Sequence, residues 1–216
     1  MDQLDIIGDR IRAEWEEKNI IRDQALKLSR EIIRNSSRAI RAVHREENEK
    51  AEEEIKAARQ GCEKLEEILN PYPDLMAAGY SRDALKEYAE ACLTYALVQD
   101  QPLPAPEDLG VSFQAYLGGL GEAAGELRRR VMDIIRHGET GEADRLLDWM
   151  DEIYGLLVTM DFPDAITGNL RRTTDLVRGV TERTRGDLTT NIQQQKLRSA
   201  LQSVEEKLQK SGLDLS

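Results

Sequence analysis

The sequence predicts an all-α protein, and two observations carry this prediction. Ala, Leu, Ile, Glu, Arg and Lys are abundant in the 216 residues, whereas aromatic residues make up only 5%; straight side chains lose little rotamer freedom in a helix. Apolar residues also recur at steps of three and four, and no segment alternates with the period of a strand. We therefore expect a single domain over residues 1–216, a bundle of six to seven mostly long helices.

The first helix is expected to run unbroken from about residue 3 to the middle forties. A first apolar stripe near its start comprises Leu4, Ile7, Ile11 and Trp15, and a second stripe of small and apolar residues covers 25–43. At 1.5 Å per residue this helix would be roughly 60 Å long. A helix of that length needs partners, in a bundle or across a subunit interface.

The later helices are separated by segments that contain proline or glycine. These breaks lie at 70–73, 101–110, 137–141 and 161–169. A strongly acidic helix over 46–67 is interpreted as solvated. Further helices are expected at about 82–100, 111–136, 141–160 and 164–209, the last with a candidate break near Gly186.

Composition also bears on location. No apolar run is long enough to cross a bilayer, and the N-terminus lacks the basic-then-apolar order of a signal peptide. We therefore expect a cytoplasmic protein with no membrane partner. Cys62 and Cys92 fit neither a disulfide framework nor a zinc pattern, which predicts reduced structural thiols.

A row of bases on the first helix is the strongest binding signal. We call it the arginine stripe, and its members follow steps of three and four: Lys27, Arg30, Arg34, Arg38, Arg41 and Arg45. His44 lies beside the end of the stripe and is counted with it as a candidate RNA-binding residue. Two interpretations stay open: a solvated face, or a surface for RNA phosphates, which the guanidinium fork suits. The net charge of −11 does not exclude such a local surface. A second, weaker cluster spans 128–130.

Four glutamates stand in segments that are otherwise apolar or small. They are Glu87, Glu90, Glu122 and Glu126. Four inward carboxylates cannot all ionise without compensation. Two kinds of compensation stay open. A divalent cation, Mg²⁺ or Mn²⁺, would suit these groups because hard ions prefer oxygen ligands, or arginine partners and water would stabilise the carboxylates instead. Di-iron chemistry is not favoured, because neither histidine follows a glutamate by three residues.

Three stretches of the chain resemble the translin superfamily, and in particular its TRAX (translin-associated factor X) branch and the TRAX-like proteins of archaea. They cover 26–45, 85–93 and 116–131, in the same order over most of the chain. The resemblance implies an all-α subunit, a hollow homo-octamer that binds RNA or single-stranded DNA, and a Mg²⁺-dependent endoribonuclease of the C3PO type that works inside the shell.

By motif position, the resemblance assigns catalytic and metal-binding roles to Glu87 and Glu90 in EYAE and to Glu122 and Glu126 in GEAAGE. The family usually has aspartate at the third position, so Glu122 is longer by one methylene. Two alternatives to the nuclease stay open. One is a non-catalytic translin-like shell that binds RNA or single-stranded DNA, and the other is a helical scaffold whose arginines bind an acidic protein. Steep loss of RNA affinity with salt would disfavour the scaffold.

Overall fold

The fold is built of helices alone. A computed structural model describes residues 3–137 and 141–210, and no strand occurs in these ranges. The long helices are α1 (Gln3–His44), α2 (Asn48–Leu69), α4 (Gly79–Val98), α6 (Phe113–His137), α7 (Gly141–Val158) and α9 (Leu170–Lys210). Four-residue helices in the connections are α3 (Pro73–Met76), α5 (Pro106–Leu109) and α8 (Asp164–Thr167). The all-α prediction is confirmed, and no helix within these ranges is long and apolar enough to span a membrane.

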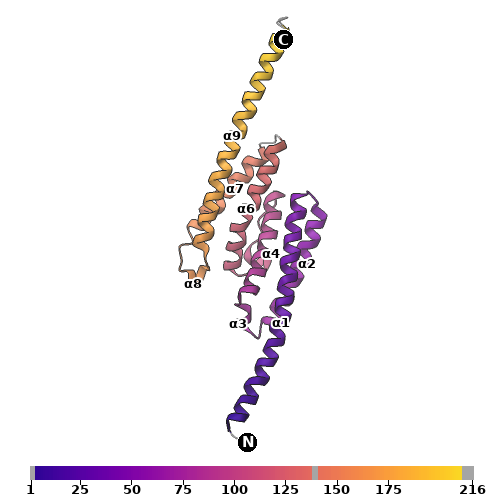
Figure 1. Ribbon diagram of the computed structural model, residues 1–216, viewed down its shortest axis with the longest axis vertical. Helices are drawn as coiled ribbons and strands as arrows, with labels where there is room; N and C mark the ends of the chain where they lie inside the picture. Colours follow the sequence, from indigo (N-terminus) through magenta and orange to yellow (C-terminus); the bar gives the residue numbers. More distant parts are fainter. Residues whose placement is uncertain (1–2, 138–140, 211–216) are drawn as a thin grey trace.

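The long helices pack side by side in a fixed order (Figure 1). α1 packs on α2 and α4, α4 packs on α6, and α6 packs on both α7 and α9. The interface between α4 and α6 therefore lies in the middle of the packed region. The start of α1 and the end of α9 project beyond it in opposite directions.

The two halves of α1 differ in burial. Its second half buries small and apolar side chains at helical spacing, among them Ala25, Ile32, Ser36 and Val43. None of residues 3–20 is buried, so the first predicted stripe lies on the surface. The prediction of one helix from residue 3 to the middle forties is confirmed, and its partner helices within this chain cover only the second half.

The acidic helix that the sequence analysis interprets as solvated is amphipathic instead. α2 buries Ala51, Ala58, Cys62, Leu65 and Leu69 on one face. These residues follow steps of seven, four, three and four, which places them in a single stripe. The acids occupy the outer face, so the net charge of the segment concealed its buried side.

The segment expected to form one helix from residue 164 is split in two. α8 ends at Thr167, and Gly168 and Asn169 both have positive φ, 55° and 69°. The positive φ favours glycine at residue 168, where a Cβ would also lie 1.6 Å from Nε2, the flexible end of the Gln114 side chain. α9 then continues to Lys210 without a break at Gly186.

Both cysteines are free and buried, Cys62 on α2 and Cys92 on α4. Burial raises the pKa of each thiol to about 12. They are therefore protonated and poorly nucleophilic at neutral pH, in keeping with the predicted structural role.

Candidate metal centre

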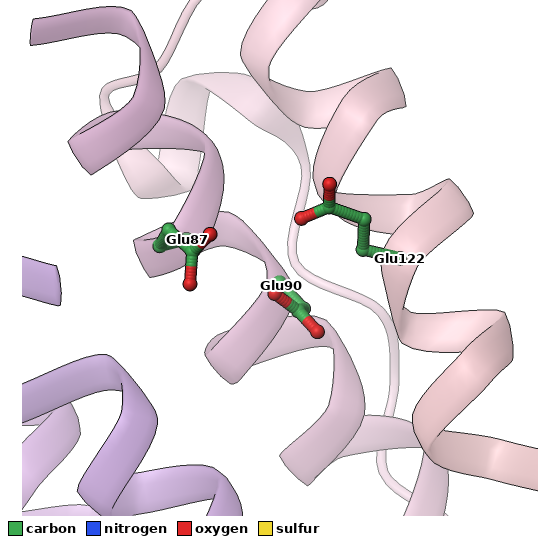
Figure 2. A group of neighbouring side chains, drawn as sticks. All are labelled: Glu87, Glu90 and Glu122. Atoms are coloured by element: carbon green, nitrogen blue, oxygen red, sulfur yellow. The ribbon is translucent and has the colours of Figure 1, made fainter. Parts of the chain in front are cut away.

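Three carboxylates converge between α4 and α6. Glu87 and Glu90 lie one turn apart on α4, and Glu122 faces them from α6 (Figure 2). One carboxylate oxygen of each lies within 4.8 Å of those of the other two. Glu90 is the most buried of the three, with 8% of its surface exposed. The structure thus brings together three of the four acids that the sequence predicts for the site.

The close approach of the two helices depends on Gly119. A Cβ at this position would lie 2.7 Å from the backbone nitrogen of Glu90 and 2.8 Å from the carbonyl oxygen of Lys86. Both atoms belong to the backbone of α4, so neither can move without shifting the helix. The absence of a side chain at residue 119 therefore sets the distance across which Glu122 meets the acids of α4.

The carboxylates are electrostatically unfavourable in each other's presence. Burial raises the pKa of Glu90 to about 8, and the negative charges of Glu122 and Glu87 add to this effect. Burial also raises the pKa of Glu87, an effect that Lys86 opposes and Glu122 reinforces. The site thus favours protons or a cation over three free negative charges.

Lys86 supplies one positive charge to this group. Its ammonium donates a hydrogen bond to Glu122 and lies 3.5 Å from Oε1 of Glu87. Burial alone would lower the pKa of Lys86, but the hydrogen bond and charge of Glu122 outweigh burial, so its pKa is raised. The spacing of the acids does not predict this role for Lys86, although Lys86 is the only base between Asp83 and Asp100.

The donor set fits a small hard cation. Mg²⁺ holds oxygen ligands at about 2.0–2.1 Å, which places neighbouring and opposite ligands roughly 3–4 Å apart. Oxygens that already lie within 4.8 Å of one another need only small side-chain movements to reach this arrangement. Glu87, Glu90 and Glu122 are therefore the residues that would hold the ion, with Lys86 displaced from their oxygens.

The fourth predicted acid, Glu126, is held apart from this group. It lies one turn beyond Glu122 on α6, and its Oε2 is 2.5 Å from Nε2 of His44 on α1. The hydrogen bond with His44 lowers the pKa of Glu126, although burial works in the opposite direction. The two ends of the acidic site therefore differ: carboxyl pKa values are raised at Glu87 and Glu90 and lowered at Glu126.

The arginine stripe lies on the outer face of α1. All six of its bases are exposed, and within the described ranges only Arg38 has a carboxylate within 4.0 Å, that of Glu54 at 3.8 Å. His44 does not share this face. Its side chain is only 4% exposed and turns toward Glu126, so the expectation that it extends the stripe does not fit its position.

The second basic cluster is occupied by internal contacts. Arg128 pairs with Asp187 on α9, and Arg130 pairs with Glu46 and Glu142. These pairs join α6 to its neighbours. The cluster therefore offers less free positive charge than its sequence suggests.

A cavity of about 370 Å³ opens beside the carboxylates. Lys86 and Glu122 line one side of it, and the polar side chains of Arg82, Gln114 and Asn169 line the others. Of the three carboxylates, Glu122 lines this cavity, next to the ammonium of Lys86.

Comparison with known proteins supports the fold and the order of these elements. No protein-family model matches the chain. An uncharacterised protein of Methanocaldococcus jannaschii is 31% identical over 190 residues, which cover 87% of this chain and 84% of that protein. AfC3PO in complex with duplex RNA is 32% identical at a TM-score of 0.79, and the crystal structure of AfC3PO is 31% identical at 0.78; each match covers 85% of this chain and 95% of the other. Apo-NeC3PO, at 21% identity and a TM-score of 0.78 over 88% of this chain and 98% of its own, shows the fold alone.

The role of Gly119 predicts a difference between two glycines of α6. Gly119→Ala is expected to destabilise the protein by about 1–3 kcal/mol, because the new methyl group meets the backbone of α4. Gly125→Ala is the matched control: nothing lies within 4 Å of its Cβ, so alanine should stabilise the helix by up to about 1 kcal/mol. Urea denaturation measures both. Equal effects of the two substitutions would contradict the role of Gly119.

The raised pKa of Glu90 predicts how stability depends on pH. Folding raises this pKa from 4.5 to about 8, so the folded metal-free protein retains a proton that the unfolded chain releases. The contribution of Glu90 to stability is therefore complete below about pH 4.5 and is lost as the pH rises through about 8. Glu90→Gln removes it, so the free energy of unfolding in chelator should fall less steeply over this range than in the wild type. Identical pH profiles would refute the assignment.

Proposed function

Because this chain belongs to the C3PO-type translin family, we propose that it is a Mg²⁺-dependent endoribonuclease that binds RNA and cleaves it inside an oligomeric shell. RNA binding is supported by the duplex RNA complex of its relative AfC3PO and by the exposed arginine stripe. The observation that carries the catalytic part is the convergence of Glu87, Glu90 and Glu122 around the buried Glu90. An acid stands at all four family positions, with Glu122 where the family usually has aspartate, and this favours the TRAX-like branch over non-catalytic translin subunits.

The residues divide the work of binding and cleavage. Glu87, Glu90 and Glu122 would hold Mg²⁺, or Mn²⁺ in its place. The bound ion would neutralise their charges, orient the scissile phosphate and stabilise charge on the phosphoryl oxygens. Lys86, displaced from the carboxylates, would face the cavity beside them and could donate to a phosphate oxygen. The arginine stripe would hold the backbone of the RNA.

One observation favours a non-catalytic shell as the second candidate function. Lys86 already provides one positive charge beside Glu122 and Glu87, so part of their negative charge is compensated without an ion. In this alternative the chain still binds RNA or single-stranded DNA through the arginine stripe, and the acidic group serves only to join α4 to α6.

A cleavage assay separates the two functions. The purified protein is expected to cut labelled RNA with Mg²⁺ and to stop when chelator is added. Glu90→Gln should lower the rate by about 10²-fold or more, because it removes a charged oxygen from the ion. Glutamine mimics the protonated carboxyl that the metal-free fold already favours, so the variant should fold. A purified protein that does not cut RNA with Mg²⁺ would leave only the non-catalytic shell, whereas cleavage that survives both chelator and Glu90→Gln would overturn the proposed roles of the ion and of Glu90.

RNA binding by the same samples is the control for that assay. Glu90→Gln should retain its RNA affinity, whereas Arg34→Gln combined with Arg41→Gln should weaken binding and flatten its dependence on salt, because counterion release accompanies phosphate contacts. A salt-independent affinity would favour the acidic-protein scaffold instead.

The surface of α1 supports assembly with further copies of this chain. Leu4, Ile7, Ile11 and Trp15 lie on one face of the projecting half of this helix and are 43 to 73% exposed. A second exposed apolar row, Leu197, Leu201 and Val204, lies on the projecting end of α9. Rows of this kind are typical of helices that pack against a partner. We propose that other subunits cover them in a homo-octamer.

Light scattering after size-exclusion chromatography tests the assembly. The wild type is expected near eight times the chain mass of 24.5 kDa. Ile7→Asp with Ile11→Asp should reduce that mass, because it places charges in the apolar row. Ala13→Asp, on the opposite face of the same helix, is the matched control and should leave the mass unchanged. An unchanged mass for the double variant would rule out this face as an interface.

A further inference from the structure

Glu126 differs from the other three acids in what surrounds it. Both of its close contacts end on the same oxygen: Oε2 lies 2.5 Å from Nε2 of His44 and 3.7 Å from Nη1 of Arg129. Glu126 does not belong to the group of three carboxylates whose oxygens lie within 4.8 Å of one another. His44 of α1 thus contacts this carboxylate, whereas Glu122 is contacted by Lys86 of α4.

The surroundings of His44 indicate which ring nitrogen carries a hydrogen toward Glu126. Its side chain is 4% exposed, and in the described part of the chain Nδ1 has no hydrogen-bond partner. A hydrogen on Nδ1 would then be a buried donor without an acceptor, which is unfavourable, whereas a bare nitrogen is tolerated better. Because the lowered pKa of Glu126 keeps its carboxylate ionised and therefore an acceptor, Nε2 of His44 carries the hydrogen that is donated to it.

The other oxygen of Glu126, Oε1, can accept a proton. Among the residues that the structure describes, none makes a hydrogen bond or an ion pair with Oε1, and the side chain is 26% exposed. A movement of Oε2 toward the ligand group would break the bond with His44 and leave its N–H buried without an acceptor, so this bond favours the present position of the carboxylate. The arrangement therefore leaves Oε1 of a partly exposed carboxylate without a partner among the described residues, on the residue one helical turn after Glu122.

We propose that Glu126 stays outside the ligand group and accepts the proton of the water that attacks the RNA, with His44 as the residue that positions it. This inference rests on the proposed nuclease function. In the step, the water oxygen bonds to phosphorus and its proton passes to Oε1 of Glu126. The bond from phosphorus to the leaving ribose oxygen breaks, that oxygen takes up a proton from solvent, and Glu126 later returns its own proton to solvent.

Two of the glutamates can be compared by metal binding as well as by cleavage. Calorimetry with Mn²⁺ is carried out on the full-length wild type, Glu126→Gln and Glu90→Gln. Glu126→Gln is expected to retain the Mn²⁺ affinity of the wild type, whereas Glu90→Gln should lose at least about tenfold. Both should lower the rate of RNA cleavage, by about 10²-fold for the loss of the base.

The outcomes separate this inference from the proposed function. Loss of Mn²⁺ affinity in Glu126→Gln similar to that in Glu90→Gln would make Glu126 a ligand and overturn the inference alone. Cleavage by Glu126→Gln at the wild-type rate would also overturn it alone. A wild type that neither binds Mn²⁺ nor cuts RNA would overturn both.

Two substitutions of His44 test its positioning role. His44→Phe keeps a planar ring but has no donor, and it should lower kcat while KM for RNA and Mn²⁺ affinity stay unchanged. His44→Gln can place an amide N–H near the position of Nε2, so it should recover part of kcat. A purely structural role would instead make stability follow the volume of the side chain. Equal kcat values for His44→Gln and His44→Phe would overturn the role of the donor, and the Glu126→Gln measurements stand even if His44→Phe fails to fold.

Discussion

The close contact of α4 and α6 at Gly119 is the constraint on which the rest of the site depends. It places the backbone of Glu90 where a side chain on residue 119 would otherwise lie. Glu122, less than one turn further along α6, must then share a small volume with Glu87 and Glu90. The packing that stabilises the middle of the fold is therefore the same packing that forces three carboxylates together. Such an arrangement is unfavourable unless a cation accompanies it, and a conflict of this kind is a common property of functional sites.

The protein resolves this conflict differently at the two ends of the acidic region. At one end, burial and like charges raise the pKa of Glu90, so that a proton, Lys86 or an ion is needed. At the other end, a donor from α1 lowers the pKa of Glu126 and keeps it ionised. Where neighbouring carboxyl groups have pKa values that diverge, they are suited to different roles, one binding positive charge and the other accepting a hydrogen.

The sequence was informative where a property depends on residues close together along the chain. The length of α1, the acid pairs on α4 and α6, and the exposed arginine stripe all follow from steps of three and four. The pairing of His44 with Glu126 joins residues 82 positions apart, and it depends on how α1 is rotated relative to α6. Spacing along one helix carries no information about that rotation. Likewise, glycine and alanine are frequent around Glu122 and Glu126 in α6, but only the structure identifies Gly119 as the point of contact with α4.

α1 connects the two parts of the proposed activity. Arg41 is the last stripe residue within α1, and on an ideal helix it lies about 60° round from His44, so the donor to Glu126 and the stripe occupy adjoining faces of the same rigid element. An RNA backbone held by the stripe would therefore be held in a fixed position relative to His44, which contacts Glu126 of α6, because α1 is unbroken between the bases and His44. The carboxylates of α4 are in turn fixed to α1 by direct packing of the two helices. In the proposed mechanism one helix would thus carry both the bases that hold the RNA and the histidine that positions the proton-accepting oxygen of Glu126.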